Sequence, residues 1–178
     1  CRCLPRGQSF VKTERCSESG KAENQSINFK GIGMDKRYMR EMTFNERSYV
    51  ATDSICAPLA NQFVFDGEGT LDPHLWRTAV TVASQANPGA RLVLKGHVGW
   101  SRWVDSGISP RVREVDGSLW NGCDPEGAPF LKKSLPFLEN PTCEVILVHG
   151  PGPRVVFRTH HGVMDGRGTL FWAEDVFR

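Results

Sequence analysis

The fold is decided by residues 143–166, which read CEVILVHGPGPRVVFRTHHGVMDG. Residues 143–149 and 154–159 are rich in β-branched and other large apolar side chains, a composition typical of β-strands. The four residues between them are glycine and proline, which favour a turn. The pattern predicts a β-hairpin whose second strand leads directly into the run HHGVMDG, residues 160–166.

A helix is predicted after this run. Residues 169–177 (TLFWAEDVF) have the spacing of an amphipathic helix. Residues 159–168 therefore join the end of a strand to the start of a helix, and connections of this kind often carry binding and catalytic residues. We expect the functional site here.

Helices and strands also alternate upstream of the hairpin. Thr43 and Glu46 have the spacing of a capping box, and Asp72 is followed by a first-turn proline, so both positions predict helix starts. The predicted elements are a helix over 45–53, a strand over 61–65, a helix from Pro73 that stops at Asn87, strand-like alternation over 91–103, and loops over 106–110 and 121–129. Strands that alternate with helices indicate an α/β fold with a mixed sheet and flanking helices.

The composition is that of an ordinary globular domain. The chain has 178 residues, of which 39% are hydrophobic. Its 22 basic residues nearly balance 20 acidic ones and form no basic block, so no nucleic-acid partner is expected. No apolar run approaches the roughly 18 residues that a membrane span needs.

The expected location is cytoplasmic, because the first residues do not resemble a secretion signal. The six cysteines are predicted to be free thiols, since no Cys-x-x-Cys pair is present and cytosolic proteins rarely form disulfides. Residues 1–41 contain few clustered apolar side chains and are expected to form a poorly ordered or extended leader before the structured residues 42–178.

The run 160–166 contains residue types that suit general-base catalysis. A neutral imidazole, with a pKa of about 6.5, can take a proton from a hydroxyl or amine. Adjacent residues on a strand point to opposite faces, so one of His160 and His161 is expected to be catalytic and the other structural. Asp165 is suited to fix an imidazole or an arginine, and Gly166 lets a backbone or thioester chain approach closely. The following helix would aim free N–H groups at a developing oxyanion.

The pattern His-His-x-x-x-Asp-Gly at a strand-to-helix turn resembles the signature of the condensation domains of nonribosomal peptide synthetases. Relatives of these domains include chloramphenicol acetyltransferase, wax-ester synthases and polyketide-associated acyltransferases. Two further features are similar to the family: an early helix with Glu46 and Arg47 before an aromatic strand, and the stretch NPGAR over residues 87–91, which is similar to the family's His-Pro-x-Leu-Arg. Asn87 and Ala90 depart from that second pattern.

The resemblance implies a role for each residue of the run. His161 would be the catalytic general base, which deprotonates or positions an amine or hydroxyl acceptor as it attacks an acyl thioester. The thioester would be carried by CoA or by the phosphopantetheine of a carrier protein, with no tightly bound cofactor. His160 would support the loop and Gly166 would keep the turn open. Asp165 would turn away to pair with an arginine, for which Arg91 and Arg158 are the candidates.

The resemblance also implies that residues 42–178 are the N-terminal lobe of a two-lobed, V-shaped fold of the chloramphenicol-acetyltransferase type. Because the chain ends at Arg178, soon after the motif, either it is a fragment of a longer protein or a second lobe on another chain completes the site. An alternative interpretation is a noncatalytic module of the same fold that docks a carrier protein or a partner. A metal site of His160, His161 and Asp165 is disfavoured, because adjacent histidines on a strand diverge and no third ligand has a familiar spacing.

Overall fold

The computed structural model describes residues 38–97 and 99–178. Most of the expected leader over residues 1–41 lies outside the described residues. Its last three residues form a short strand, β1 (Met39–Glu41), which pairs with β4 (Arg102–Asp105). β1 therefore lies within the segment that the sequence analysis assigned to the leader.

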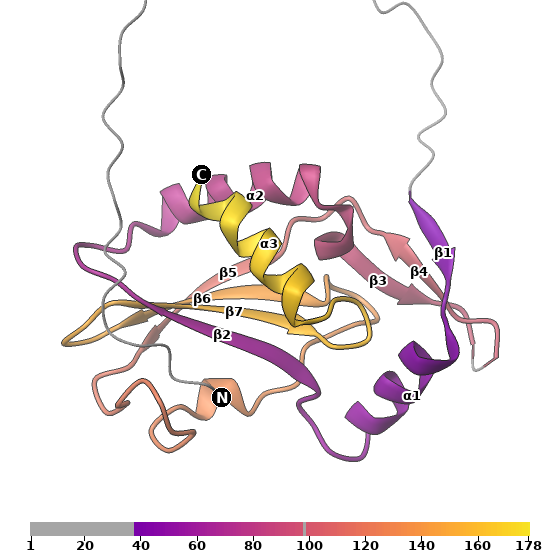
Figure 1. Cartoon of the computed structure of the whole chain (residues 1–178), viewed down its shortest axis with the longest axis horizontal. Helices are drawn as coiled ribbons and strands as arrows, with labels where there is room; N and C mark the ends of the chain where they lie inside the picture. Colours follow the sequence, from indigo (N-terminus) through magenta and orange to yellow (C-terminus); the bar gives the residue numbers. More distant parts are fainter. Residues whose placement is uncertain (1–37, 98) are drawn as a thin grey trace, which may run out of the picture.

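A four-stranded mixed sheet is built from β2 (Ala60–Asp66), β5 (Arg111–Asp116), β6 (Cys143–His149) and β7 (Arg154–His160). Its strand order is β2-β7-β6-β5 (Figure 1). β7 pairs antiparallel with both β2 and β6, whereas β5 runs parallel to β6. The predicted mixed sheet and the predicted hairpin, which is β6 and β7, are both confirmed.

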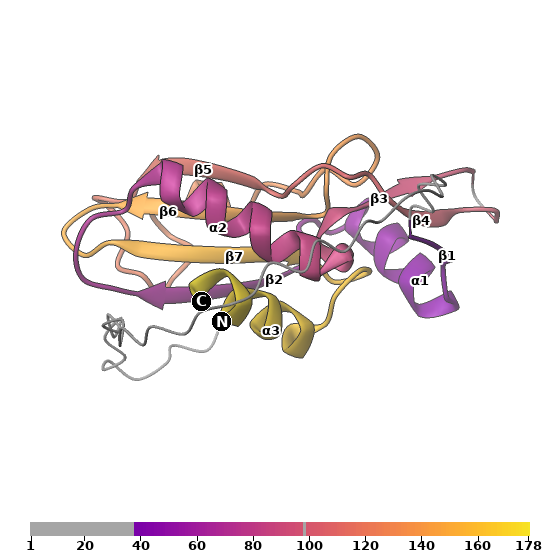
Figure 2. The same cartoon turned by 90° about the horizontal axis from the view of Figure 1, so that it is seen from above.

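Two helices cover one face of this sheet, α2 (Pro73–Ala86) and α3 (Gly166–Phe177) (Figures 1 and 2). An apolar cluster fills the space between these helices and the sheet, and its buried members include Val80, Leu147, Phe157 and Trp172. Both predicted helices are confirmed, although α3 begins three residues earlier than predicted because the Asp165 side chain caps it. Within the described ranges, no helix is long and apolar enough to cross a membrane.

A smaller antiparallel sheet has the order β1-β4-β3, where β3 is Leu92–Lys95. The expected strand-like alternation over 91–103 is therefore wrong in its middle part. Gly96 and Gly99 have φ angles of 100° and 96°, a region that favours glycine, and they turn the chain back before β4. Trp100 lies in this turn with 80% of its surface exposed.

The helix α1 (Phe44–Asp53) leads from the small sheet towards β2 (Figure 1). The predicted capping box is present at its start. The Thr43 hydroxyl accepts a hydrogen bond from the Glu46 N–H, and the Glu46 carboxylate accepts one from the Thr43 N–H. Because most of the α1 surface is polar and little of it is buried, the capping box is an important source of stability for this helix.

β5 lies in a segment for which the sequence predicted no element. Four of its six residues are charged, so its composition does not indicate a strand. The parallel pairing with β6 stabilises it instead. On the face of the main sheet opposite the helices, the short 3-10 helix η2 (Pro129–Leu131) and its neighbours cover a second apolar cluster that includes Ile146 and Val156.

Candidate active site

The run 160–166 spans the end of β7 and the start of α3, as predicted. The chain turns immediately after the strand, because the His160 carbonyl accepts hydrogen bonds from the N–H groups of Val163 and Met164 at 2.9 and 3.3 Å. The Val163 side chain packs against the apolar cluster of the small sheet. The turn is therefore held by its own backbone and by a contact outside the main sheet.

His160 is a buried residue with only 1% of its surface exposed. Its Nδ1 accepts a hydrogen bond from the Gly162 N–H at 3.0 Å, so the neutral ring carries its proton on Nε2. That Nε2 makes no hydrogen bond and lies 4.0 Å from Oδ2 of the buried Asp53. Burial lowers the pKa of His160, and the neighbouring Asp53 charge offsets this only in part. Burial therefore favours the neutral form of the His160 ring.

His161 has a different environment from its neighbour. It is half-buried, and its ring lies against the ring of Tyr49 with 4.5 Å between the centroids. Its backbone N–H donates to the Leu59 carbonyl at 3.0 Å. Its Nδ1 is buried without a hydrogen-bond partner, whereas Nε2 is not among the buried, unpaired atoms of the described chain.

Asp165 is the N-cap of α3. Its Oδ1 accepts from the Gly168 N–H at 2.7 Å, and its backbone carbonyl accepts from the Thr169 N–H at 3.0 Å. This satisfies N–H groups that would otherwise be free at the helix start. The carboxylate is solvent-exposed, and among the described residues it makes no ion pair.

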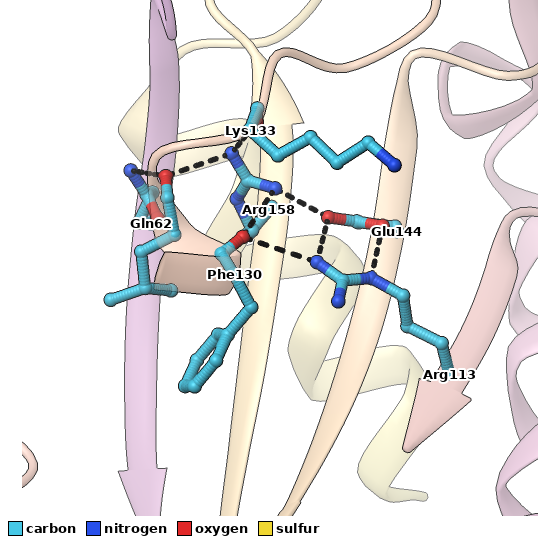
Figure 3. Close-up of polar contacts among 7 residues, drawn as sticks. Gln62, Arg113, Phe130, Lys133, Glu144 and Arg158 are labelled. Atoms are coloured by element: carbon cyan, nitrogen blue, oxygen red, sulfur yellow. Dashed lines mark hydrogen bonds and ion pairs between the residues drawn. The ribbon is translucent and has the colours of Figure 1, made fainter. Parts of the chain in front are cut away.

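The expected pairing of Asp165 with an arginine is therefore wrong. Arg91 pairs with Asp105 at 2.5 Å, and Arg158 pairs with Glu144 at 2.5 Å (Figure 3). The reason is the alternation of side chains along β7. Thr159 faces α3, where its hydroxyl contacts that of Thr169 at 2.6 Å, so Arg158 must face the opposite side of the sheet.

The closest backbone approaches in the turn occur at two glycines other than Gly166. A Cβ at Gly168 would lie 2.8 Å from Met164 Cγ, and a Cβ at Gly162 would lie 3.0 Å from His160 Nδ1. A Cβ at Gly166 would make only an ordinary contact with Phe63 at 3.5 Å. A side chain would therefore fit least well at Gly162 and Gly168, the glycines before and after Val163 and Met164.

Figure 3 shows a buried ion network on the face of the sheet towards which Arg158 points. Glu144 accepts from Arg113 Nε at 2.9 Å and from Arg158. Arg158 also donates to the carbonyls of Leu131 and Lys133, at 3.1 and 2.6 Å. The network fixes the segment around η2 onto the sheet, so Arg158 has a structural role.

A metal site is not evident, because no group of three histidine, cysteine or acidic side chains in residues 38–97 and 99–178 is arranged to hold a metal ion. A surface hollow of about 140 Å³ is lined by five residues, Glu41, Arg47, Gly99, Trp100 and Arg102. None of these residues belongs to the run 160–166.

Solved structures with a similar fold come from peptide synthetases. The epimerization domain from the third module of tyrocidine synthetase B has a TM-score of 0.62 and 18% identity, over 79% of this chain and 33% of that one. The starter condensation domain of rhizomide synthetase has a TM-score of 0.58 and 18% identity, over 78% of this chain and 36% of that one. The first condensation domain of the calcium-dependent antibiotic synthetase has a TM-score of 0.60 and 14% identity, over 78% and 37%. This chain has the fold of part of a condensation domain.

The condensation-domain fold confirms the resemblance and the fold class expected from the sequence. The chain spans about a third of the length of these solved structures, which is consistent with one lobe. A variant of the rhizomide synthetase domain was solved in complex with C8-CoA. No protein-family model and no curated protein matches this sequence.

Several residues around the run 160–166 were not predicted from the sequence. Asn61 donates to the Met164 carbonyl at 2.7 Å, and Tyr49 contacts the His161 ring. Asn61 is one of three polar residues in β2, with Gln62 and Asp66, so the sequence alone did not distinguish it. Tyr49 and Asp53 lie on a mostly polar helix, where nothing in the sequence distinguishes them.

Proposed function

We propose that this chain carries the general base of a condensation-type acyltransferase. The enzyme would transfer an acyl group from a CoA or carrier-protein thioester to an amine or hydroxyl acceptor. The condensation-domain fold supports the reaction class, and the motif at the strand-to-helix turn supports the site. The proposal locates the reaction in the cytosol, where thiols such as the buried Cys143 remain reduced.

The observation that carries the proposal is the arrangement of His161. Its backbone N–H donates to the carbonyl of Leu59, the residue before β2, and its ring rests on that of Tyr49, which restricts the orientation of the imidazole. Nδ1 is buried without a partner, whereas Nε2 is not among the buried, unpaired atoms of the described residues. A fixed imidazole with one accessible nitrogen is what general-base catalysis requires.

In the proposed reaction, His161 Nε2 takes the proton of the acceptor as its nitrogen or oxygen attacks the thioester carbonyl. The new bond forms and the carbonyl oxygen becomes an oxyanion. The carbon–sulfur bond then breaks, and the thiol leaves with the proton from His161. His160 supports the loop through Gly162, while Asp165 and Gly166 form the start of α3.

The test is acyl transfer by the native protein that contains this chain, with acyl-CoA and acylated carrier protein as alternative donors and release of free thiol as the readout. His161→Ala should lower kcat by about 100- to 10,000-fold, the usual contribution of a positioned acid–base group. His74→Ala, an exposed histidine on α2, is the matched control and should keep wild-type transfer. Unchanged transfer by His161→Ala would refute the base assignment.

A second candidate is a noncatalytic docking module of the same fold. The unpartnered Nδ1 favours it, because a catalytic imidazole is usually oriented by a hydrogen bond to its second nitrogen. This candidate predicts that the wild-type protein binds an acylated carrier protein without consuming the thioester. It also predicts that His161→Ala leaves the binding affinity unchanged. Turnover of either donor by the wild type would exclude it.

A further inference from the structure

Asp53 is a buried carboxylate that no part of the proposed mechanism uses. It is the last residue of α1 and has only 5% of its surface exposed. Burying a carboxylate costs free energy unless hydrogen bonds and charges compensate for it. Its surroundings therefore indicate what the residue does.

One oxygen of Asp53 is connected to the backbone of His161. Oδ1 accepts a hydrogen bond from the Leu59 N–H at 2.5 Å. The carbonyl of the same Leu59 accepts from the His161 N–H at 3.0 Å. Two hydrogen bonds that share one residue thus connect the end of α1 to the backbone of the proposed base.

The other oxygen of Asp53 faces the side chain of His160. Oδ2 lies 4.0 Å from Nε2, the nitrogen that carries the proton because Nδ1 accepts from the Gly162 N–H. This distance is too long for a hydrogen bond, but where water is excluded a carboxylate still attracts the positive end of a neutral ring's N–H dipole. The carboxylate therefore favours the tautomer that keeps the bond to Gly162.

We infer that Asp53 is a positioning residue for His161. Its Oδ1 binds the N–H of Leu59, whose carbonyl binds the His161 N–H, and its Oδ2 faces the ring of His160. The inference rests on the proposed function, in which His161 is the general base. Asp53 does not touch the substrate. It acts through Leu59 and His160, the two residues that connect it to the base.

The isosteric variant Asp53→Asn tests this inference sharply. An asparagine can accept from Leu59 with its oxygen, but its NH₂ group then faces the Nε2–H of His160. Flipping the amide transfers the conflict to the Leu59 N–H. Changing the tautomer of His160 transfers it to the Gly162 N–H. No arrangement of asparagine accepts from Leu59, presents an oxygen to the His160 Nε2–H and keeps the Gly162 bond, as Asp53 does, although the side chain has the same shape.

The first experiment is nitrogen NMR of the histidine rings in the full chain, which reports the tautomer and needs no activity. Wild-type His160 should carry its proton on Nε2, and Asp53→Asn should shift or mix the tautomers. Asp124→Asn, an exposed residue that accepts from Asn121, is the matched control and should change nothing. A wild-type His160 protonated on Nδ1 overturns the inference, and so does an unchanged ring in folded Asp53→Asn.

The second experiment measures acyl transfer by the same variants in the native protein. Asp53→Asn should lower kcat by about 10- to 100-fold, the usual effect of losing a supporting interaction, with KM within about twofold. Wild-type transfer by folded Asp53→Asn overturns the inference. If the wild type transfers no acyl group, the proposed function fails, and the NMR result still decides whether Asp53 sets the tautomer. If Asp53→Asn does not fold, a wild-type His160 ring protonated on Nδ1 would still overturn the inference.

Discussion

The two faces of the main sheet are stabilised by different interactions. The face under α2 and α3 is apolar, with Leu147, Phe157 and Trp172 in one cluster. The opposite face has its own apolar cluster, with Ile146 and Val156, but it also buries charges, because Glu144 lies between Arg113 and Arg158 (Figure 3).

The motif lies where these two regions meet. Thr159 belongs to the helix side of β7, whereas Arg158 faces the charged side. The arginines are committed to their own partners, so Asp165 serves α3 as a cap. The comparison shows that the alternation of one strand can separate a structural ion network from a candidate catalytic turn.

The largest expected effect comes from breaking the charged face. Glu144→Ala would leave Arg158, which is 1% exposed, without its counter-ion, so the free energy of unfolding should fall by about 3–5 kcal/mol at pH 7. Urea unfolding of the variant and the wild type measures this. A loss below about 1 kcal/mol would show that the network contributes little.

The same variant should respond to pH. Burial tends to raise the pKa of Glu144, but the hydrogen bonds and charges of Arg113 and Arg158 lower it below the usual value. A carboxylate with a lowered pKa stabilises the fold above its unfolded pKa of about 4.5 and loses this contribution as pH falls through the lower folded value. The difference between Glu144→Ala and wild type should therefore shrink below about pH 4.5.

A mutation on the apolar face should be nearly as costly but independent of pH. Leu147→Ala removes a fully buried side chain three residues after Glu144 on the other face of β6 and should cost about 2–5 kcal/mol. Urea unfolding at pH 7 and pH 4 should give the same difference from wild type. If the cost of Leu147→Ala were smaller at pH 4 than at pH 7, as expected for Glu144→Ala, the assignment of the two faces would be contradicted.

A smaller effect is expected from the buried imidazole of the motif. Because burial lowers the pKa of His160, the unfolded chain binds its proton more readily than the folded chain does. Stability should therefore rise with pH up to about 6.5 and be lost as pH falls below that value. Thermal unfolding between pH 5 and pH 8 measures this slope, and His160→Leu should reduce it. An unchanged slope in the variant would assign it to other groups.

The smallest effect concerns the cap of α3. Asp165→Ala should cost about 1 kcal/mol, the usual value for losing an N-cap, and Asp165→Asn should cost only a few tenths. Thermal unfolding at low and high salt measures both variants. A loss of several kcal/mol for Asp165→Asn would indicate an arginine partner for the carboxylate after all.

Local patterns predicted the elements whose signals are contained within a few residues. The hairpin followed from two apolar runs around GPGP, and the starts of α1 and α2 followed from Thr43 and Asp72. β5 was not predicted, because its charged residues are stabilised by pairing with β6 rather than by their own propensities.

The candidate site was predicted only in part for the same reason. The motif is one continuous run, so its position between β7 and α3 could be inferred. The partners of its residues come from distant segments. Asp53 comes from the end of α1 and accepts a hydrogen bond from the backbone N–H of Leu59, which no sequence pattern marks. Arg158 reaches Glu144 because β6 and β7 pair in that register, which the sequence does not reveal.

The most direct test of the central claim is the single-turnover rate of acyl transfer to an amine acceptor by the native protein carrying this chain, for wild type and His161→Ala. The variant should keep a melting temperature within a few degrees of wild type, because its ring is only half-buried. Its transfer rate should fall by about 100- to 10,000-fold. A folded His161→Ala protein that transfers the acyl group at the wild-type rate would contradict the account.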